Sequence, residues 1–319
     1  MRNFSNSYNK FVFGLEQINE AAAKYPKEFV DSMEMMFKKE ISDLASFVLK
    51  PENKCKILML AGPSSSGKTT TAYKLRDELI KRGRRTIIIS LDDFYLGKGK
   101  APILLDGKHD YEAVEALDVQ AVKDCLFSLM QNRFCDAPKF DFKTKSPFND
   151  KMHIELGEDD IVIVEGLHAL NPIFTSSFPK KEGILKAYIS VKQGIKDYNG
   201  VVFSRRDVRL VRRLARDYRS RGADAEDTLS MWDSVARGEF LYIHPFKRTS
   251  DVTVNSIHIY EPCVLCHQAM PLLRSINKDS VYFKFSRRIL SSIERFYPID
   301  IELVPTDSLI REFIGGGIY

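Results

Sequence analysis

The chain has 319 residues, of which 44% are hydrophobic and 29% charged, a composition typical of ordinary folded domains. Its 48 basic and 43 acidic residues leave a formal net charge of only +5, which argues against a general nucleic-acid binder. No apolar run approaches the roughly 18 residues of a membrane-spanning helix, and the N-terminus has no apolar signal core, so we expect a cytoplasmic protein without a membrane partner.

The N-terminal segment is predicted to be helical. Residues 15–50 repeat apolar side chains at helical spacing, with an interruption at Pro26, and we expect two helices there. The sequence "KPENK" (50–54) then separates these helices from a different pattern. We therefore treat residues 1–53 as a helical extension.

From residue 54 onward, short apolar runs alternate with helical patterns. The helical patterns are clearest at 119–131 and 205–221. Strands that are apolar throughout and alternate with helices predict an α/β fold, a parallel sheet with helices on both faces. We place this core at residues 54–260. The predicted strands are "KCKILMLA" (54–61), "RRTIIISL" (84–91), "DIVIVEG" (160–166), "LKAYISV" (185–191) and "SDVTVNS" (250–256).

The C-terminal segment, 261–319, is predicted to be mostly helical, with a short strand at "IELVP" (301–305). The sequence "CVLCH" (263–267) matches a c-type haem attachment pattern. The apolar residues of "CVLCHQAMPLL" have helical spacing, which favours a plain helix instead. A zinc site would need a second pair of ligands, which we do not find in the sequence. The five cysteines are odd in number and scattered, so we expect them to be reduced.

The sequence "AGPSSSGKTTT" (61–71) predicts a site for nucleotide phosphates. It fits G-x-x-x-x-G-K-[ST], and it lies between a predicted strand and a predicted helix, as a phosphate-binding loop requires. The Lys68 ammonium would reach the β- and γ-phosphates, and the Thr69 hydroxyl would ligate Mg²⁺. The residues expected to hold the nucleotide are Gly62, Ser64, Ser65, Ser66, Gly67, Lys68, Thr69 and Thr70.

Carboxylates follow two of the predicted strands. Asp92 and Asp93 stand in "SLDDFY" (90–95), and Glu165 ends "DIVIVE" (160–165). Ligands gather at the carboxyl ends of parallel strands, where a carboxylate accepts a hydroxyl proton or holds Mg²⁺. The alternatives are a helix N-cap for either aspartate and a structural cap for Glu165.

An arginine-rich helix is predicted over "SRRDVRLVRRLARDYRSRG" (204–222). Its arginines recur at spacings of three and four, which places them near one side of the helix. We interpret it as a lid that brings cations to the phosphates, because phosphoryl transfer requires positive charge there. A solvated basic face and a nucleic-acid surface are the alternatives. The arginines concerned are Arg205, Arg209, Arg212, Arg213 and Arg216.

Together these motifs resemble the uridine kinase / phosphoribulokinase family of P-loop kinases over roughly residues 55–260. The resemblance includes "HDYEAVEALD" (109–118), "PKFDF" (138–142) and "VEGLHALNP" (164–172), in addition to the motifs above. The "SMWDSVARGE" segment (230–239) and the terminal "SLIREFIGG" resemble a subgroup whose long forms carry a TGS domain. The first 50 residues are too short and too helical for that domain.

The resemblance implies a P-loop NTPase fold and an ATP- and Mg²⁺-dependent kinase. Asp92 would be the general base on the acceptor hydroxyl and Lys68 the phosphate-binding lysine, while Arg213 and Arg216 would be lid cations. An acidic residue at 110–112 would take ribose hydroxyls. The implied metal ligands are Thr69, Glu165 and Asp92, and the implied acceptor-binding residues are Tyr95, Asp110, Glu112, Phe140 and Lys145.

Two positions depart from the family pattern. Lys145 stands where uridine kinases carry a histidine that contacts uracil, and Met231 stands where they carry a glutamine. We expect a nucleoside kinase that phosphorylates a 5′-hydroxyl. A kinase of another sugar, polyol or acidic alcohol is the alternative that Lys145 favours. A nucleotide-dependent regulator that binds RNA is a further alternative, against which no guanine-reading N-K-x-D motif is present. A homo-oligomer built by the flanking segments is left open.

Overall fold

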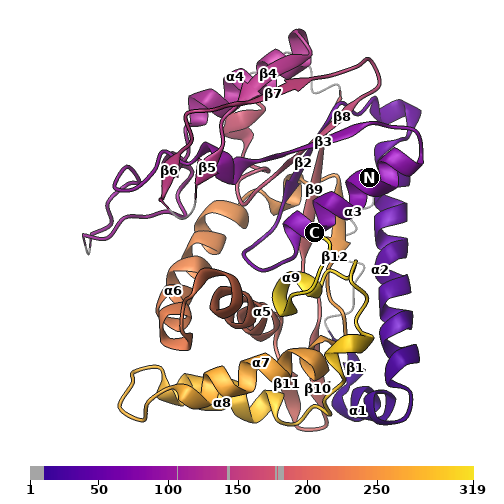
Figure 1. The fold of residues 1–319 in the computed structure, drawn as a ribbon, viewed down its shortest axis with the longest axis vertical. Helices are drawn as coiled ribbons and strands as arrows, with labels where there is room; N and C mark the ends of the chain where they lie inside the picture. Colours follow the sequence, from indigo (N-terminus) through magenta and orange to yellow (C-terminus); the bar gives the residue numbers. More distant parts are fainter. Residues whose placement is uncertain (1–10, 106, 142–143, 177, 179–182) are drawn as a thin grey trace.

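The computed structural model describes residues 11–105, 107–141, 144–176, 178 and 183–319. Its centre is a five-stranded parallel sheet with the strand order β12-β9-β2-β8-β3 (Figure 1). Four strands lie within the apolar runs predicted from the sequence and β9 begins one residue before its run, so the predicted α/β fold with a parallel sheet is confirmed. The strands are β2 (Ile57–Ala61), β3 (Thr86–Ser90), β8 (Ile161–Glu165), β9 (Ile184–Ser190) and β12 (Val252–Asn255).

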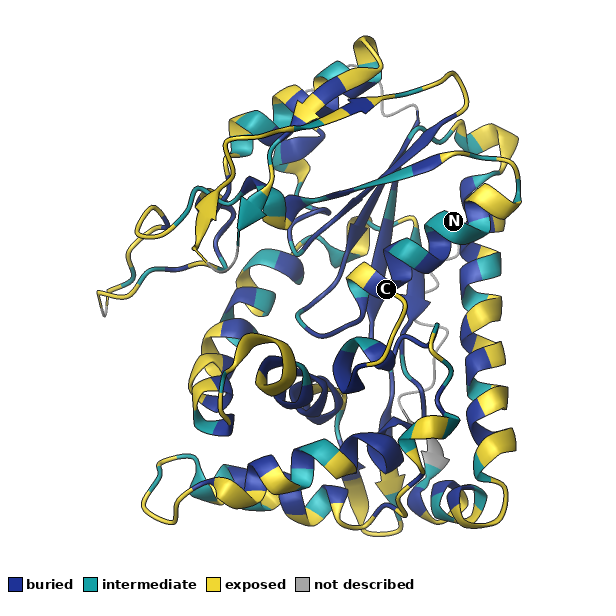
Figure 2. Cartoon of the chain, viewed as in Figure 1, coloured by how far each residue is buried: buried dark blue, intermediate teal, exposed yellow. Residues whose placement is uncertain are grey.

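The sheet separates two hydrophobic cores. Leu58 and Leu60 of β2 point to one core, and Ile57, Met59 and Ala61 of the same strand point to the other. A strand buried on both faces must be apolar at every position, which explains why these segments lack an alternating pattern. In Figure 2 the two strands β2 and β8 are buried along their whole length.

The helices lie on both faces of the sheet (Figure 1). Pro26 begins the second helix, as predicted, because its fixed φ and missing N–H suit a first helical position. Side-chain caps begin the helices predicted at 119–131 and 205–221: Asp118 accepts from the Ala121 N–H, and Ser204 forms a capping box with Asp207. The helices are α1 (Leu15–Lys24), α2 (Pro26–Val48), α3 (Lys68–Lys81), α4 (Val119–Gln131), α5 (Arg205–Arg221), α6 (Ala225–Gly238), α7 (Glu261–Ser275), α8 (Phe283–Ile293) and α9 (Arg311–Ile314).

Smaller strands and 3₁₀ turns complete the described part of the chain. β5 and β6 form a short hairpin beside the sheet, and β4 pairs with β7 next to α4. These strands are β1 (Phe11–Gly14), β4 (Phe134–Ala137), β5 (Phe140–Asp141), β6 (Ser146–Pro147), β7 (Met152–Glu155), β10 (Gly194–Asp197) and β11 (Gly200–Phe203).

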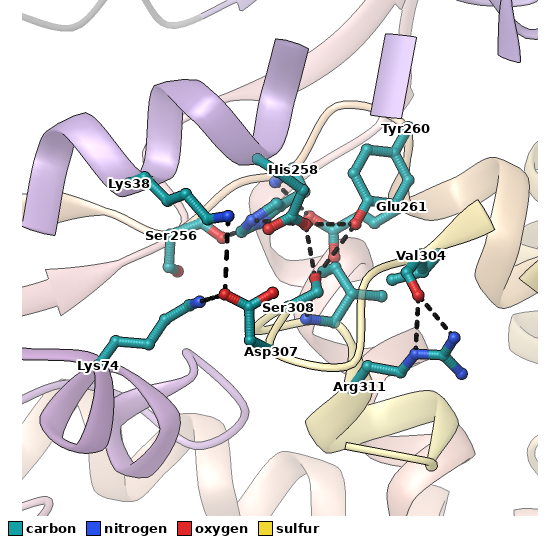
Figure 3. Close-up of polar contacts among 12 residues, drawn as sticks. Lys38, Lys74, Ser256, His258, Tyr260, Glu261, Val304, Asp307, Ser308 and Arg311 are labelled. Carbon is teal, nitrogen blue, oxygen red and sulfur yellow. Dashed lines mark hydrogen bonds and ion pairs between the residues drawn. The ribbon is translucent and has the colours of Figure 1, made fainter. Parts of the chain in front are cut away.

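The two flanking segments share the core of the central domain. The same hydrophobic cluster contains side chains from α1, α2, α3, α5 and α7 to α9. Polar contacts join the segments as well: the Tyr260 and Ser308 hydroxyls both donate to the buried Glu34 carboxylate, at 2.7 and 2.6 Å (Figure 3). Asp307 pairs with Lys74 of α3 at 3.1 Å. The described helices of the N-terminal extension, α1 and α2, and residues 261–319 are therefore packed against one core.

One predicted element of the C-terminal segment is wrong. Residues 301–305 do not form a strand, because Ile301–Leu303 is a 3₁₀ turn (η8) that the Asp300 side chain caps by accepting from the Glu302 N–H. The predicted helix at "CVLCHQAMPLL" is confirmed as part of α7, where Cys263 and Cys266 are buried. Among the helices of the described residues, none combines the length and apolar character needed to cross a bilayer.

The shared core predicts that the N-terminal extension and the catalytic core unfold together. The single tryptophan, Trp232 in α6, is buried and reports on the core. Phe37 of α2 is 2% exposed, so Phe37→Ala should lower the free energy of unfolding by about 3 to 5 kcal/mol. Urea unfolding followed by Trp232 fluorescence measures this loss.

Met36→Ala is the matched control, because Met36 lies beside Phe37 on α2 and is 58% exposed. We expect it to change the free energy of unfolding by no more than about 0.5 kcal/mol. If Phe37→Ala left the Trp232 transition in place while circular dichroism showed a separate early loss of helix, the extension would be an independent unit.

Candidate active site

The phosphate loop joins β2 to α3 and has the close contacts that its glycines permit. A side chain at Gly62 would collide with the Ile189 carbonyl of β9 and with the Ser66 hydroxyl. Gly67, which caps α3, has φ +83°, and a side chain there would collide with Leu309. The loop therefore presents its backbone at the N-terminus of a 14-residue helix, where anions bind favourably.

The C-terminal segment closes one side of this loop. The Thr70 hydroxyl donates to Glu312 Oε2 at 2.7 Å, and Leu309 packs against Gly67. Further along α3, the Tyr319 ring stacks on Tyr73 with 5.8 Å between centroids. Glu312, in the segment "SLIREFIGG", was not predicted as a neighbour of the loop, because a contact across 242 residues leaves no periodic signal in the sequence.

Glu165 lies at the end of β8 beside the first turn of α3. Its Oε1 accepts from the Ser90 hydroxyl at 2.8 Å and from the Thr69 hydroxyl at 3.5 Å. Burial and the negative charge of Asp92 raise the pKa of Glu165 to about 7, against the opposing positive charge of Lys68. The ionised form of a buried carboxyl is stabilised by a positively charged partner. The oxygens of Glu165 and Thr69 are of the type that Mg²⁺ prefers, so these residues fit a magnesium site.

The two aspartates after β3 have different environments. They lie in the 3₁₀ turn η3 (Leu91–Phe94), which places Asp92 at the surface of the site and turns Asp93 away. Asp93 Oδ1 accepts from the Phe140 N–H at 3.1 Å, so it supports the β5 strand. Asp92 instead acts electrostatically on Glu165, Glu112 and Tyr95, whose pKa values its charge raises. The Asp92 N–H donates to the Ser90 hydroxyl at 3.3 Å, and Ser90 in turn donates to Glu165, so Asp92 lies at the same edge of the sheet as Glu165.

The predicted acceptor-binding residues gather around Glu112, although Asp110 is already occupied. Tyr95 and Phe140 lie with 5.8 Å between ring centroids. The buried Asp110 carboxylate accepts from the Tyr242 hydroxyl at 2.9 Å and from the Glu112 N–H at 3.2 Å, and pairs with Arg237 at 3.0 Å. Of the two acids at 110–112, Glu112 is thus the one with a free carboxylate among its described contacts.

Glu112 is held close to the end of α6. A side chain at Gly238 would collide with Glu112 Cβ, so glycine is required at this approach. Burial raises the pKa of Glu112 to about 7, and the positive charges of Arg213 and Lys68 oppose the rise. Glu112 therefore lies within the field of Arg213 and Lys68, the cations predicted to bind phosphate.

The two positions that depart from the family pattern are both exposed. Lys145 lies in the β5–β6 hairpin in the left-handed region (φ +57°), and its carbonyl accepts from the Lys98 N–H at 3.0 Å. Met231 is 41% exposed on α6. Contacts of their side chains with a substrate stay a prediction.

The arginines of α5 differ in burial and in their partners, which their spacing in the sequence did not reveal. Arg212 is fully buried and pairs with Glu261 of α7, so it is a structural residue rather than part of a lid surface. Arg209 pairs with Glu239. Arg213 donates to the Ser64 hydroxyl at 2.9 Å, and both Arg213 and Arg216 pair with Asp217. Arg213 is thus already at the phosphate loop.

Two buried hydroxyls of the loop also fit a phosphate ligand. Ser65 Oγ and Ser66 Oγ have no hydrogen-bond partner among the described residues. Ser65 has φ +57°, a strained value for serine. No group of three or more histidine, cysteine or carboxylate side chains with metal-ligand spacing occurs in the described part of the chain, so any Mg²⁺ here would also need hydroxyl or phosphate oxygens.

Comparisons with known proteins agree with this geometry. The family model described as "Phosphoribulokinase / Uridine kinase family" matches residues 57–261, more than half of the chain. The chain is 27% identical to a uridine kinase of Lactobacillus helveticus over 62% of its own length and 85% of that protein. It is 28% identical to uridine-cytidine kinase B of Dictyostelium discoideum, over 62% of this chain and 73% of that one. A solved structure of a possible uridine kinase from Bacillus stearothermophilus superposes with a TM-score of 0.47 at 18% identity, covering 68% of this chain and 98% of that chain.

The raised pKa of Glu112 predicts a pH-dependent stability. Between its unfolded value near 4.5 and about 7, the folded state keeps a proton that the unfolded state has lost, so stability falls as pH rises through this window. Glu112→Gln removes this effect. The free energy of unfolding of Glu112→Gln, relative to that of wild type, should therefore rise by on the order of 2 to 3 kcal/mol from pH 5 to pH 8, since one pKa unit corresponds to about 1.4 kcal/mol.

Urea unfolding at four pH values between 5 and 8 measures the difference. Glu115→Gln, which neutralises an exposed carboxylate in the same loop, is the control and should follow the wild-type pH curve. Parallel curves for wild type and Glu112→Gln would contradict the assignment.

Proposed function

The chain belongs to the phosphoribulokinase / uridine kinase family, and we propose that it transfers the γ-phosphoryl group of ATP to the 5′-hydroxyl of a nucleoside. Phosphotransfer to a hydroxyl group is what the family establishes. The ATP donor is implied by the phosphate loop, and the nucleoside acceptor is the finer part of the proposal. It rests on the similarity to uridine and uridine-cytidine kinases.

The observation that carries the proposal is the position of Asp92. Its charge acts on Glu165, beside the phosphate loop, and on Glu112 and Tyr95, in the predicted acceptor pocket. A carboxylate in this position would accept the proton of an attacking hydroxyl. General base catalysis of this kind contributes roughly 10² to 10⁴ in rate.

Positive charge at the loop would supply the remaining stabilisation. Lys68 stands at the first position of α3, and Arg213 contacts Ser64 of the loop. Negative charge develops on the transferred phosphoryl group, and fixed cations lower the barrier by stabilising it. Arg216 lies one turn further along α5 and is paired with Asp217. Its guanidinium would add to this field by contacting a phosphate in addition to Asp217.

Thr69, Glu165 and Asp92 would hold Mg²⁺. A Mg²⁺ ion held there would supply positive charge against the phosphates of the nucleotide. The chain's own contribution is to fix Glu165 through Ser90 and to keep it buried, so that its charge is available only to a bound cation.

The acceptor would lie over Tyr95 and Phe140, with hydroxyls donated to Glu112. The aromatic pair provides a face for a flat base or a sugar. A kinase of another sugar, polyol or acidic alcohol is the second candidate. It is favoured by Lys145 and Met231, which replace the polar groups that contact uracil in the family pattern.

Two substitutions test the catalytic assignment. Asp92→Asn keeps the shape of the side chain but removes its basicity, so ATP affinity should stay within about threefold while turnover falls by 10²-fold or more. Lys68→Ala should weaken both, because it removes a phosphate contact. Calorimetric ATP titration and a coupled ADP assay measure the two quantities. Near-normal turnover of Asp92→Asn on the preferred acceptor would disprove the base assignment.

A substrate panel tests the acceptor. With ATP and Mg²⁺, we expect turnover on uridine or cytidine and an increase of tenfold or more in KM on Glu112→Gln, with a smaller change in kcat. Turnover confined to sugars, polyols or acidic alcohols would select the second candidate. Loss of turnover in Lys145→Ala on an acidic acceptor, with retention on neutral ones, would identify the charge that selects it.

A further inference from the structure

A second cavity lies next to the phosphate loop and is not used by the proposed reaction. It has a volume of about 870 Å³ and extends from Pro63 and the end of β9 to the start of α5 and the π-helical turn η6 (Glu239–Ile243). None of Lys68, Asp92 and Glu165 lines it. The cavity is therefore separate from the site described above.

The wall of this cavity is strongly basic. Glu239 is the one acidic residue in its lining, and this carboxylate is already shared by Arg209 and His244. Lys192, Arg205, Lys247 and Arg248 form no ion pair within the part of the chain that the structure describes. The cations of the lining are Lys192, Arg205, Arg206, Arg209, Lys247 and Arg248.

These cations disfavour one another in the absence of an anion. The ammonium of Lys192 lies 4.7 Å from the Tyr188 ring centroid and is partly buried. Burial, together with the positive charges of Lys247 and Arg205, lowers the pKa of Lys192 to about 8. A solvated basic face would keep such charges apart in water, whereas here they converge on a concave surface.

We propose that this cavity binds a phosphorylated small molecule carrying two or more negative charges. Its volume lies in the range of small-molecule pockets, roughly 300 to 1,000 Å³, which includes nucleotides. Guanidinium groups bind phosphate oxygens in pairs, and lysines add point charge. Phe240 is 66% exposed at the rim and offers a face for a base or an apolar group.

The helix α6 separates this cavity from the acceptor pocket. Its last residue, Gly238, approaches Glu112, while Ala236 and Glu239 line the cavity. Arg209 connects the cavity to the nucleotide site, because it lines the one and donates to the Ser64 carbonyl of the phosphate loop at 3.4 Å. A bound anion would therefore lie beside the loop without occupying it.

Inorganic pyrophosphate titrated by calorimetry tests the proposal. The background is Lys68→Ala in the full chain, which weakens binding at the phosphate loop. Adding Lys247→Ala and Arg248→Ala should weaken pyrophosphate binding by tenfold or more. Binding in the Lys68→Ala background should also weaken steeply between 50 and 300 mM salt, as charge-driven binding does.

Lys278→Ala with Lys284→Ala is the matched control, since it removes the same charge from exposed positions on α8 and the loop before it. We expect this control to bind pyrophosphate within twofold of the background. Equal affinity in the cavity variant and the control, or no heat of binding in the Lys68→Ala background, would overturn the proposal. Thermal unfolding of each variant shows that any loss is not a loss of fold.

A nucleoside diphosphate separates two sources of the same chemistry. If it binds more tightly than pyrophosphate and Phe240→Ser removes that gain, the ligand is a nucleotide. If the two bind equally, the ligand is an inorganic or sugar phosphate. The proposal does not depend on the proposed function, because neither the acceptor nor turnover enters the measurement.

Discussion

The arrangement around the phosphate loop depends on one buried arginine. Arg212 of α5 is 0% exposed, and its guanidinium donates to both carboxylate oxygens of Glu261 and to the carbonyls of Ser65 and Ser256. A charge removed from water is tolerated only when it is paired and hydrogen-bonded on all sides. The phosphate loop, the end of β12 and the start of α7 must therefore remain together around this side chain. The Phe313 ring, 5.0 Å away, adds the C-terminal segment to the same cluster.

The sheet could be predicted from the sequence because burial on both faces leaves a continuous apolar run. The same reasoning failed at 301–305, where apolar residues at Ile301 and Leu303 pack from a 3₁₀ turn. In a segment of three residues, the alternating apolar pattern of a strand cannot be distinguished from the apolar pattern of a turn. Asp300 decides the outcome through its cap, and a single capping residue is a weak signal before its geometry is known.

The site was predictable where one motif implies one geometry, and less so where contacts come from distant segments. The loop, Asp92 and Glu165 follow from strand ends that meet at one edge of a sheet. Spacing placed the arginines of α5 near one side but did not distinguish Arg212, in the core, from Arg213, at Ser64. Asp110 likewise resembled a free carboxylate until Tyr242 and Arg237 were found to occupy it.

Ser64 of the phosphate loop contacts two arginines of α5. Arg213 donates to its hydroxyl, and Arg209, one helical turn earlier, donates to its carbonyl. Arg213 acts on Glu112 in the predicted acceptor pocket, whereas Arg209 is paired with Glu239 in the basic cavity. An anion in that cavity would compete with Glu239 and Ser64 for Arg209, because all three present negative charge or lone pairs to one guanidinium. Through Arg209, the proposed anion would therefore act on the backbone of the phosphate loop at Ser64.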